Sequence, residues 1–266
     1  MTSTPGAPVY DAIGRGYIVT RRPDPRIARA IDAALGEAAS VVNVGAGAGS
    51  YEPAHRRVIA VEPSPEMIRQ RPDRAAPVVR AVAERLPFVD GAFDAALAVL
   101  TVHHWSDRVA GLRELARVAR RRAVILTWDP AARDAFWLTS EYLPAILDLD
   151  VPRFPTLADI ARSFAGIQVA PLRVPHDCAD GFLGAFWRRP EAYLDPAVRR
   201  AMSGIALLPP PVVEAAVDRL AADLRSGRWE TRFGHLRGKD SADLGYRLIV
   251  ADTRRGRTVH VSNPAH

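Results

Sequence analysis

A glycine-rich turn followed by a lone acid gives this sequence its clearest potential for binding a ligand. An apolar run ending in Asn-Val leads into Gly-Ala-Gly-Ala-Gly at residues 45–49, and a second apolar run, residues 58–61, ends at Glu62. Glycines after a buried strand let the backbone approach a ligand and leave N–H groups free at the start of the next helix. A carboxylate at the end of the next strand can accept hydrogen bonds from ribose hydroxyls. The spacing predicts a site for a nucleoside-bearing cofactor.

The glycine pattern itself is G-x-G-x-G. The dinucleotide fingerprint G-x-G-x-x-G would need a glycine where Ser50 stands, and no Gly-Lys-Ser/Thr follows to complete a phosphate-binding loop. For the glycine run alone, a strand-to-helix turn without a ligand is the competing interpretation. The strand, the glycines, the second strand and its terminal acid together favour a cofactor site.

The elements that would position these residues alternate between strand and helix. This alternation predicts a doubly wound parallel sheet with right-handed crossovers, whose ligands bind at the carboxyl ends of the strands. The expected strands are residues 41–45, 58–62, 78–82, 95–100 and 123–128, and the expected helices are 26–35, 64–70 and 110–119, the first beginning behind Asp24-Pro25.

The second half of the chain contains helical segments rich in large apolar residues, which predict a helical cap over the cofactor site. We expect helices at 131–149, 156–164 and 211–225, and strands at 168–175 and 244–251. The expected organisation is a 1–25 N-terminal cap segment, a 26–130 cofactor-binding core, a 131–252 helical substrate cap interleaved with the last two core strands, and a 253–266 tail.

Composition narrows the class of protein. With 266 residues and 48% hydrophobic content, the chain can form one large domain or one domain with an insertion. The net charge is +6, but Lys239 is the only lysine and the arginines are spread along the chain, which argues against a nucleic-acid footprint. The densest run, residues 117–122, is expected in a solvated turn before a strand. Cys178 is the only cysteine, which excludes an internal disulfide.

No apolar signal core or run of membrane-spanning length is present. We therefore expect a cytoplasmic protein with no membrane or nucleic-acid partner. No His/Cys/acid cluster has the spacing of metal ligands, and we expect no metal.

Four segments at these positions resemble the class I S-adenosylmethionine-dependent methyltransferases, in the small-molecule, type 11-like group. They are residues 43–49, 61–64, 83–88 with 93–94, and 98–105, and the resemblance covers about residues 10–130. It implies a Rossmann-like seven-stranded sheet with the last strand antiparallel, S-adenosyl-L-methionine as cofactor, and a small-molecule acceptor. An aromatic or apolar acceptor is a separate expectation, drawn from aromatic residues that could line a pocket but could equally pack the cap on the core, namely Trp105, Phe136, Trp137, Phe182, Phe186 and Trp187. The protein would be a monomer or a homodimer.

The resemblance also implies a set of cofactor-binding residues. Asn43, Gly45, Ala46 and Gly47 would pass the methionine and ribose portions, Glu62 with Pro63 would hold the ribose, Met67, Ala83 and Glu84 would lie near the adenine, Leu100 and Thr101 would face the methionine end, and Tyr10, Tyr17 and Arg22 would cap the site. Two positions depart from the family, since Asn43 replaces an acid and Val82 stands where an Asp often reads the adenine. We expect Asn43→Asp to retain or tighten cofactor binding.

A general base helps methyl transfer only when the acceptor carries a proton on the attacking atom. The candidates at strand ends are His176, ranked first, and His104, His103 and Asp129. A packing role competes for the paired histidines, and a turn role competes for Asp129.

Two other functions remain open. One is a non-catalytic S-adenosylmethionine-binding regulatory or scaffold protein. The other is a nucleic-acid methyltransferase, which lacks support because Thr101-Val102-His103-His104 stands where an Asn/Asp-Pro-Pro-Tyr motif would be needed.

Overall fold

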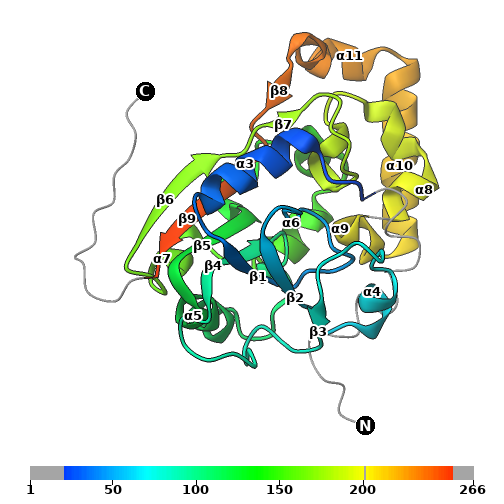
Figure 1. Ribbon diagram of the computed structural model, residues 1–266. Coiled ribbons are helices and arrows are strands. Elements are labelled where there is room, and N and C mark those ends of the chain that lie inside the picture. The colour runs from blue at the N-terminus through cyan, green and yellow to red at the C-terminus, as the bar shows by residue number, and fades with distance from the viewer. Residues whose placement is uncertain (1–20, 201, 254–266) are drawn as a thin grey trace.

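A seven-stranded sheet forms the centre of the molecule in the computed structural model, which describes residues 21–200 and 202–253. The strand order is β3-β2-β1-β4-β5-β9-β6 (Figure 1). Strands β1 to β5 run parallel, whereas β9 is antiparallel to both of its neighbours, β5 and β6. This confirms the expected Rossmann-like sheet with its last strand antiparallel. The strands are β1 (Ser40–Val44), β2 (Arg57–Val61), β3 (Val78–Val79), β4 (Phe93–Val99), β5 (Ala119–Trp128), β6 (Gly166–Pro171) and β9 (Tyr246–Asp252).

Successive side chains of the central strands point to opposite faces of the sheet, and helices cover both faces, so these strands are buried on both sides. Val41 and Leu97 pack on the face covered by helix α3 (Pro25–Leu35), which contributes Ile27, Ile31 and Leu35. Val42 and Ala98 pack on the opposite face, covered by helix α5 (Arg108–Val118) with Leu112, Leu115 and Val118. Two apolar clusters therefore hold the sheet between helical layers.

The helices that follow β1 and β2 are short or missing, so the polar loops at that edge stay accessible. Only α4 (Pro65–Arg69) follows β2, and it begins where the Ser64 hydroxyl accepts a hydrogen bond from the Met67 N–H. Helix α3 begins at Pro25, directly after its N-cap Asp24, and the Asp24 carboxylate accepts a hydrogen bond from the Arg26 N–H. Both starts were expected from N-cap chemistry in the sequence.

Helical segments fill the two late connections between strands of the sheet. Between β5 and β6 lie η2 (Pro130–Ala132), η3 (Leu138–Tyr142), α6 (Ala145–Asp150) and α7 (Leu157–Ala161). Between β6 and β9 lie η4 (Leu183–Phe186), η5 (Pro190–Leu194), α8 (Pro196–Arg200), α9 (Ser203–Ala206), α10 (Pro210–Arg225), α11 (Arg228–Phe233) and η6 (Gly234–Gly238). Figure 1 shows α8 to α11 gathered beyond one end of the sheet.

The second half departs from the expected elements in three places. The helix expected at 131–149 is three short pieces, and the segment 156–164 packs Ile160 and Phe164 on the α5 face of the sheet. The strand expected at 168–175 splits, because β7 (Val174–Pro175) leaves β6 to pair with β8 (Ser241–Ala242) in a separate two-stranded sheet. No helix in the described part of the chain has both the length and the apolar character needed to cross a membrane.

The arginine-rich run is also different from expectation, because it belongs largely to β5 and not to a turn. Ala119 already pairs with Phe93, and Arg122 pairs with Ala95. The Arg120 guanidinium donates to Asp94 at 2.8 Å, and that of Arg122 donates to the Ala34 carbonyl at 3.1 Å. Arg120 and Arg122 thus each connect β5 to another segment of the chain.

Candidate functional site

A pocket lies at the carboxyl ends of β1, β2, β3 and β4, at the edge where the sequence placed it. It encloses about 980 Å³, counting the part that is open to solvent. Loops that follow four neighbouring strands supply its walls. Of the residues expected at a cofactor, Asn43, Gly45, Ala46, Gly47, Glu62, Pro63, Met67, Ala83, Glu84, Leu100 and Thr101 all line this first pocket.

Gly45 opens the glycine turn in a backbone conformation that only glycine adopts without strain. Its φ is +70°, and a Cβ at this position would lie 2.0 Å from the Thr101 Oγ1. The N–H groups of Gly45 and Ala46 donate to the Val61 carbonyl at 2.8 and 3.0 Å. The turn is therefore tied to the end of β2 and pressed against the end of β4.

Glu62 is only 6% exposed, and its carboxylate is hydrogen-bonded to the same glycine turn. Its two carboxylate oxygens accept hydrogen bonds from the Gly47 N–H at 2.8 Å and the Ser64 N–H at 2.9 Å. These contacts fix the orientation of the carboxylate at the pocket wall. A carboxylate ion has capacity for further hydrogen bonds from ligand hydroxyls.

A buried ion pair supports the turn from the side of the sheet. Arg71 and Glu52 approach to 2.7 Å, and both side chains are less than a tenth exposed. The Asn43 amide donates to the Glu52 carboxylate at 3.3 Å, and Arg71 donates to the Gly47 carbonyl at 3.1 Å. Asn43, the position that departs from the family, thus belongs to this charged support.

A second pocket adjoins the first, and Arg21 and Leu100 line both. It encloses about 790 Å³, again counting open space. Leu100 stands at the junction with a φ of +50°, which turns the backbone between the two pockets. The walls of the second pocket are largely apolar and aromatic, with Trp128, Phe136, Phe154, Phe182 and Tyr246 among them.

The paired histidines divide between the pockets, with His104 in the first and His103 in the second. Their rings lie 3.8 Å apart, and His103 stacks on Phe154 at 3.9 Å. Burial, and then the charge of Arg153, lower the pKa of His104 to about 3, and burial also lowers the pKa of His103 well below its usual value. Both rings are therefore neutral at physiological pH. Within the described residues, the buried Nδ1 of His103 has no hydrogen-bond partner.

The N-terminal segment reaches the site through Arg21. Arg22, the residue expected there, is exposed and lines neither of the two adjoining pockets. The Arg21 Nε lies 2.5 Å from the Asp180 carboxylate, to which the Tyr51 hydroxyl also donates at 2.8 Å. Tyr10 and Tyr17 lie outside the described residues.

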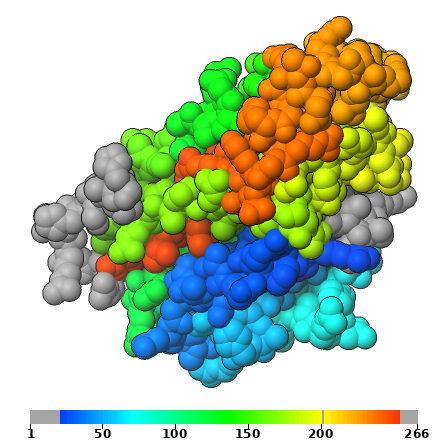
Figure 2. Space-filling view, turned by 90° about the horizontal axis from the view of Figure 1, so that it is seen from above, coloured from blue at the N-terminus to red at the C-terminus, as the bar shows by residue number. Residues whose placement is uncertain are grey.

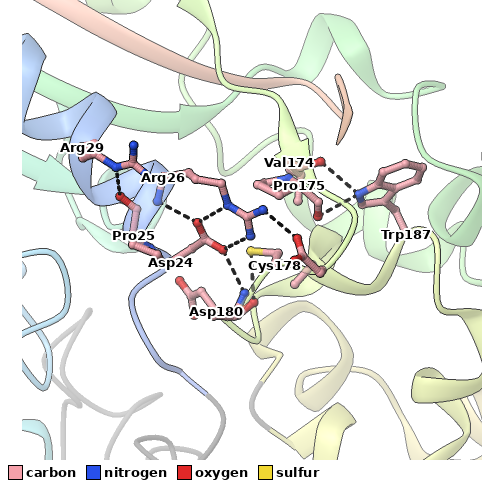
Figure 3. A network of polar contacts seen from close by, with 12 residues as sticks. Asp24, Pro25, Arg26, Arg29, Val174, Pro175, Cys178, Asp180 and Trp187 are labelled. Atoms are coloured by element: carbon pink, nitrogen blue, oxygen red, sulfur yellow. Dashed lines mark hydrogen bonds and ion pairs between the residues drawn. The ribbon is translucent and has the colours of Figure 1, made fainter. Parts of the chain in front are cut away.

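A polar network extends this attachment to the start of α3 (Figure 3). The buried Asp24 carboxylate accepts hydrogen bonds from Arg26 at 2.7 Å and from the Ala179 N–H at 3.0 Å. Burial alone would raise the pKa of Asp24, but these hydrogen bonds and the Arg26 charge lower it well below its usual value. In Figure 2 the blue residues of this segment lie directly against the later, yellow-green and orange parts of the chain.

Two of the expected catalytic residues lie outside both pockets. His176 follows β7, where its N–H donates to the Asp240 carbonyl at 2.9 Å. It was placed at the carboxyl end of a core strand, but that strand ends at Pro171. Asp129 instead caps η2 by accepting from the Ala131 N–H, and it lies 3.9 Å from Arg247.

Asp150 is a pocket residue that the sequence did not single out. It lines the second pocket at the end of α6. Burial raises the pKa of its carboxyl group to about 6, although the nearby Arg153 acts in the opposite direction. The sequence carried no motif at this position, because Asp150 lies in the cap, where only amphipathic spacing was available.

Comparisons with known proteins agree with this geometry. The family described as "Methyltransferase domain" matches residues 42–127. A crystal structure of a putative methyltransferase from an antibiotic biosynthesis pathway of Anabaena variabilis is 33% identical and superposes with a TM-score of 0.80, covering 87% of this chain and 98% of that one.

Several curated relatives are named demethylmenaquinone methyltransferases, and one, from Xenopus tropicalis, is named a tRNA (carboxymethyluridine(34)-5-O)-methyltransferase. The protein of Mycolicibacterium vanbaalenii is 38% identical over 92 residues, which cover 35% of this chain and 37% of the relative. That of Corynebacterium kroppenstedtii is 31% identical over 173 residues, which cover 59% of this chain and 72% of the relative. The chain spans 37% to 48% of the length of the first curated relatives that it matches. The fold, the glycine turn and these likenesses show that the chain belongs to the class I S-adenosylmethionine-dependent methyltransferases.

Proposed function

We propose that this protein transfers the methyl group of S-adenosylmethionine to a small apolar acceptor by in-line displacement. The observation that carries the proposal is the pair of adjoining pockets, one built on the glycine turn and one apolar, with Arg21 and Leu100 shared between them. A donor in the first pocket and an acceptor in the second would meet at this junction.

The residues of the first pocket fit the cofactor. Glu62 offers a buried, fixed carboxylate for ribose hydroxyls, and Gly45 allows backbone approach that a side chain would block. Met67, Ala83 and Glu84 would hold the adenine side, and Leu100 and Thr101 the methionine side. When bound, the cofactor supplies a methyl group on a positively charged sulfur.

The work of the protein would be alignment of the acceptor and exclusion of water. Aromatic walls around the second pocket suit both tasks for an apolar molecule. The relatives named for demethylmenaquinone support an acceptor of this kind. His103, in the wall of the second pocket, and His104, in the wall of the first, would act as neutral hydrogen-bonding groups.

Calorimetric titration with S-adenosylmethionine and S-adenosylhomocysteine tests the first half of the proposal. We expect Glu62→Ala to abolish binding, whereas Glu37→Ala, at an exposed position, should leave it unchanged. Wild-type protein that binds neither compound would contradict the proposal.

Methyl-labelled S-adenosylmethionine tests the second half. The protein would be incubated with a small-molecule extract, and label is expected in an apolar, organic-soluble product with formation of S-adenosylhomocysteine. Binding without any transfer of label would favour a non-catalytic role.

A further inference from the structure

We propose that Asp150 binds the acceptor in the second pocket, and that the acceptor is an apolar, ring-bearing molecule whose hydroxyl group passes its proton to this carboxylate. The inference rests on the proposed function, and it narrows the acceptor atom to oxygen.

The Asp150 carboxylate is available to a ligand. Its side chain is 14% exposed, and its ion pair with Arg153 is long, at 3.9 Å. No side chain or N–H group among the described residues donates a hydrogen bond to this carboxylate. Among the described residues that line the second pocket, Asp150 is the only acidic one. Gly204, on α9, faces it closely, since a Cβ there would lie 3.4 Å from the Asp150 Oδ2.

Two other polar groups of the pocket wall, on Trp128 and Thr139, are already engaged. The Trp128 Nε1 donates to the Leu244 carbonyl at 3.1 Å, and the Thr139 hydroxyl donates to the Phe136 carbonyl at 3.0 Å. A ligand therefore meets largely aromatic and apolar surface, with a small set of polar groups that includes Asp150, the buried His103 Nδ1 and the side chains of Arg21, Arg133 and Ser203. Such a wall selects a ring system that carries one polar group.

The charges around the pocket favour a hydroxyl over an ammonium group. Arg21, which is paired with the buried Asp180, and Arg133 line the same pocket, and Arg153 lies beside Asp150. Positive side chains oppose a cationic acceptor, whereas they stabilise an oxygen that gains negative charge as its proton leaves.

Methyl transfer and loss of the hydroxyl proton accompany each other in the proposed step. A bond forms between the acceptor oxygen and the methyl carbon, while the carbon–sulfur bond of the donor breaks and leaves its electron pair on sulfur. The acceptor O–H bond breaks, its electrons stay on oxygen, and the proton passes to Asp150. A carboxyl with a pKa of about 6 is mostly ionised at neutral pH and is a stronger base than an ordinary aspartate.

Several titratable groups surround Asp150. Arg153 is on the loop that follows it, Tyr246 is on β9, His103 is on the short helix η1 (Val102–His104), and Arg21 is on the N-terminal segment. Neighbouring η3 carries Glu141 and Tyr142, which are engaged by Arg232 at 2.7 Å and Asp223 at 2.9 Å. Arginine and tyrosine keep their charge states near pH 6, and His103 stays neutral, so Asp150 is the group expected to titrate there.

Binding of 1-naphthol and of its methyl ether, 1-methoxynaphthalene, tests the inference without turnover. Tryptophan fluorescence would report binding in the presence of S-adenosylhomocysteine. We expect wild-type protein to bind 1-naphthol about tenfold more tightly than the ether, because only the hydroxyl donates a charge-assisted hydrogen bond. This preference should grow as pH rises through about 6.

Asp150→Asn should remove both the pH dependence and most of the preference, whereas Asp148→Asn, an exposed acid on the same helix, should keep them. Equal binding of the two probes by wild type, or an unchanged preference in Asp150→Asn, would overturn the inference. The same proteins would be titrated with S-adenosylmethionine. A wild type that fails this titration refutes the proposed function, whereas intact cofactor binding without hydroxyl preference refutes only the role of Asp150.

Discussion

Asn43 shows how one contact can reverse an expectation drawn from sequence. The residue is 2% exposed, and its amide donates to Glu52, which is itself paired with Arg71. An aspartate here would set two carboxylates against each other, so the structure argues against retained or tighter cofactor binding. We expect Asn43→Asp to lower stability by about 1–3 kcal/mol and to weaken S-adenosylmethionine binding, measured by thermal unfolding and calorimetry.

A second substitution isolates the cause of this effect. Asn43→Asp combined with Glu52→Gln removes the like-charge contact and should recover part of the lost stability. Unchanged unfolding temperature and affinity in the single variant would show that the contact with Glu52 has no energetic weight.

Gly45 and Gly227 form a matched pair for testing the glycine turn. Both have positive φ values, +70° and +76°, but a Cβ at Gly227 meets nothing within 4 Å, whereas one at Gly45 meets Thr101. Gly227→Ala should cost only the backbone strain, about 1–2 kcal/mol. Gly45→Ala should destabilise further and abolish cofactor binding in a calorimetric titration. Similar losses in both variants would mean that the close approach to Thr101 is unimportant.

Asp150 should leave a signature in the pH dependence of stability. Its pKa rises from 3.8 to about 6 on folding, so the unfolded chain binds fewer protons between these values. The free energy of unfolding should therefore fall by about 2 kcal/mol as pH rises from about 4 to about 6. Denaturant titrations of wild type and Asp150→Asn would show this slope as their difference. Parallel curves for the two proteins would contradict it.

At the scale of elements, the buried Asp180 is one of several contacts that attach the N-terminal segment to the loop after β7. Asp180 is 1% exposed and holds both Arg21 and the Tyr51 hydroxyl. We expect Asp180→Asn to destabilise by about 3 kcal/mol, because it leaves a partly buried arginine without its counter-charge. Affinity for ligands of both pockets should fall as well. Asp177→Asn, at an exposed partner of Arg26, is the control and should change neither property.

The core elements could be predicted because their patterns are local. Runs of β-branched residues marked β1, which leads into the glycine turn, and β2, which ends before Glu62. N-cap chemistry at Asp24 and Ser64 marked the helix starts. The start of β5 could not be read in this way. Arg120 and Arg122 look like a solvated turn, but their guanidinium groups bind partners far along the chain.

The candidate site divides along the same line. Residues of the first pocket follow strand ends, and they could be placed from the glycine turn, from Glu62 and from the resemblance to the methyltransferase family. His176 was misplaced because the bend between β6 and β7 depends on pairing with β8, which is distant in sequence. Asp150 and Arg21 reach the second pocket through tertiary packing, which no periodicity or motif in the sequence predicts.

Over the whole molecule, the two pockets share Arg21 and should bind their ligands cooperatively. We expect S-adenosylhomocysteine to tighten 1-naphthol binding about fivefold or more, and 1-naphthol to tighten S-adenosylhomocysteine binding by the same factor. Titrations of each ligand with and without the other would measure this factor. Arg21→Ala should bring it close to one, whereas Arg22→Ala, at an exposed neighbour that lines neither pocket, should preserve it. An undiminished factor in Arg21→Ala would refute the coupling.

The place of β9 in the sheet has a consequence for how the molecule is made. This strand lies between β5 and β6, although it is the last of the described strands to leave the ribosome. Until it arrives, β5 and β6 each keep an unpaired edge, and Ile249 and Ala251 are missing from the apolar cluster on the α5 face. A nascent chain therefore exposes two strands that invite pairing with other chains. Pairing of residues 246–252 with both strands closes the two edges at once and completes the sheet.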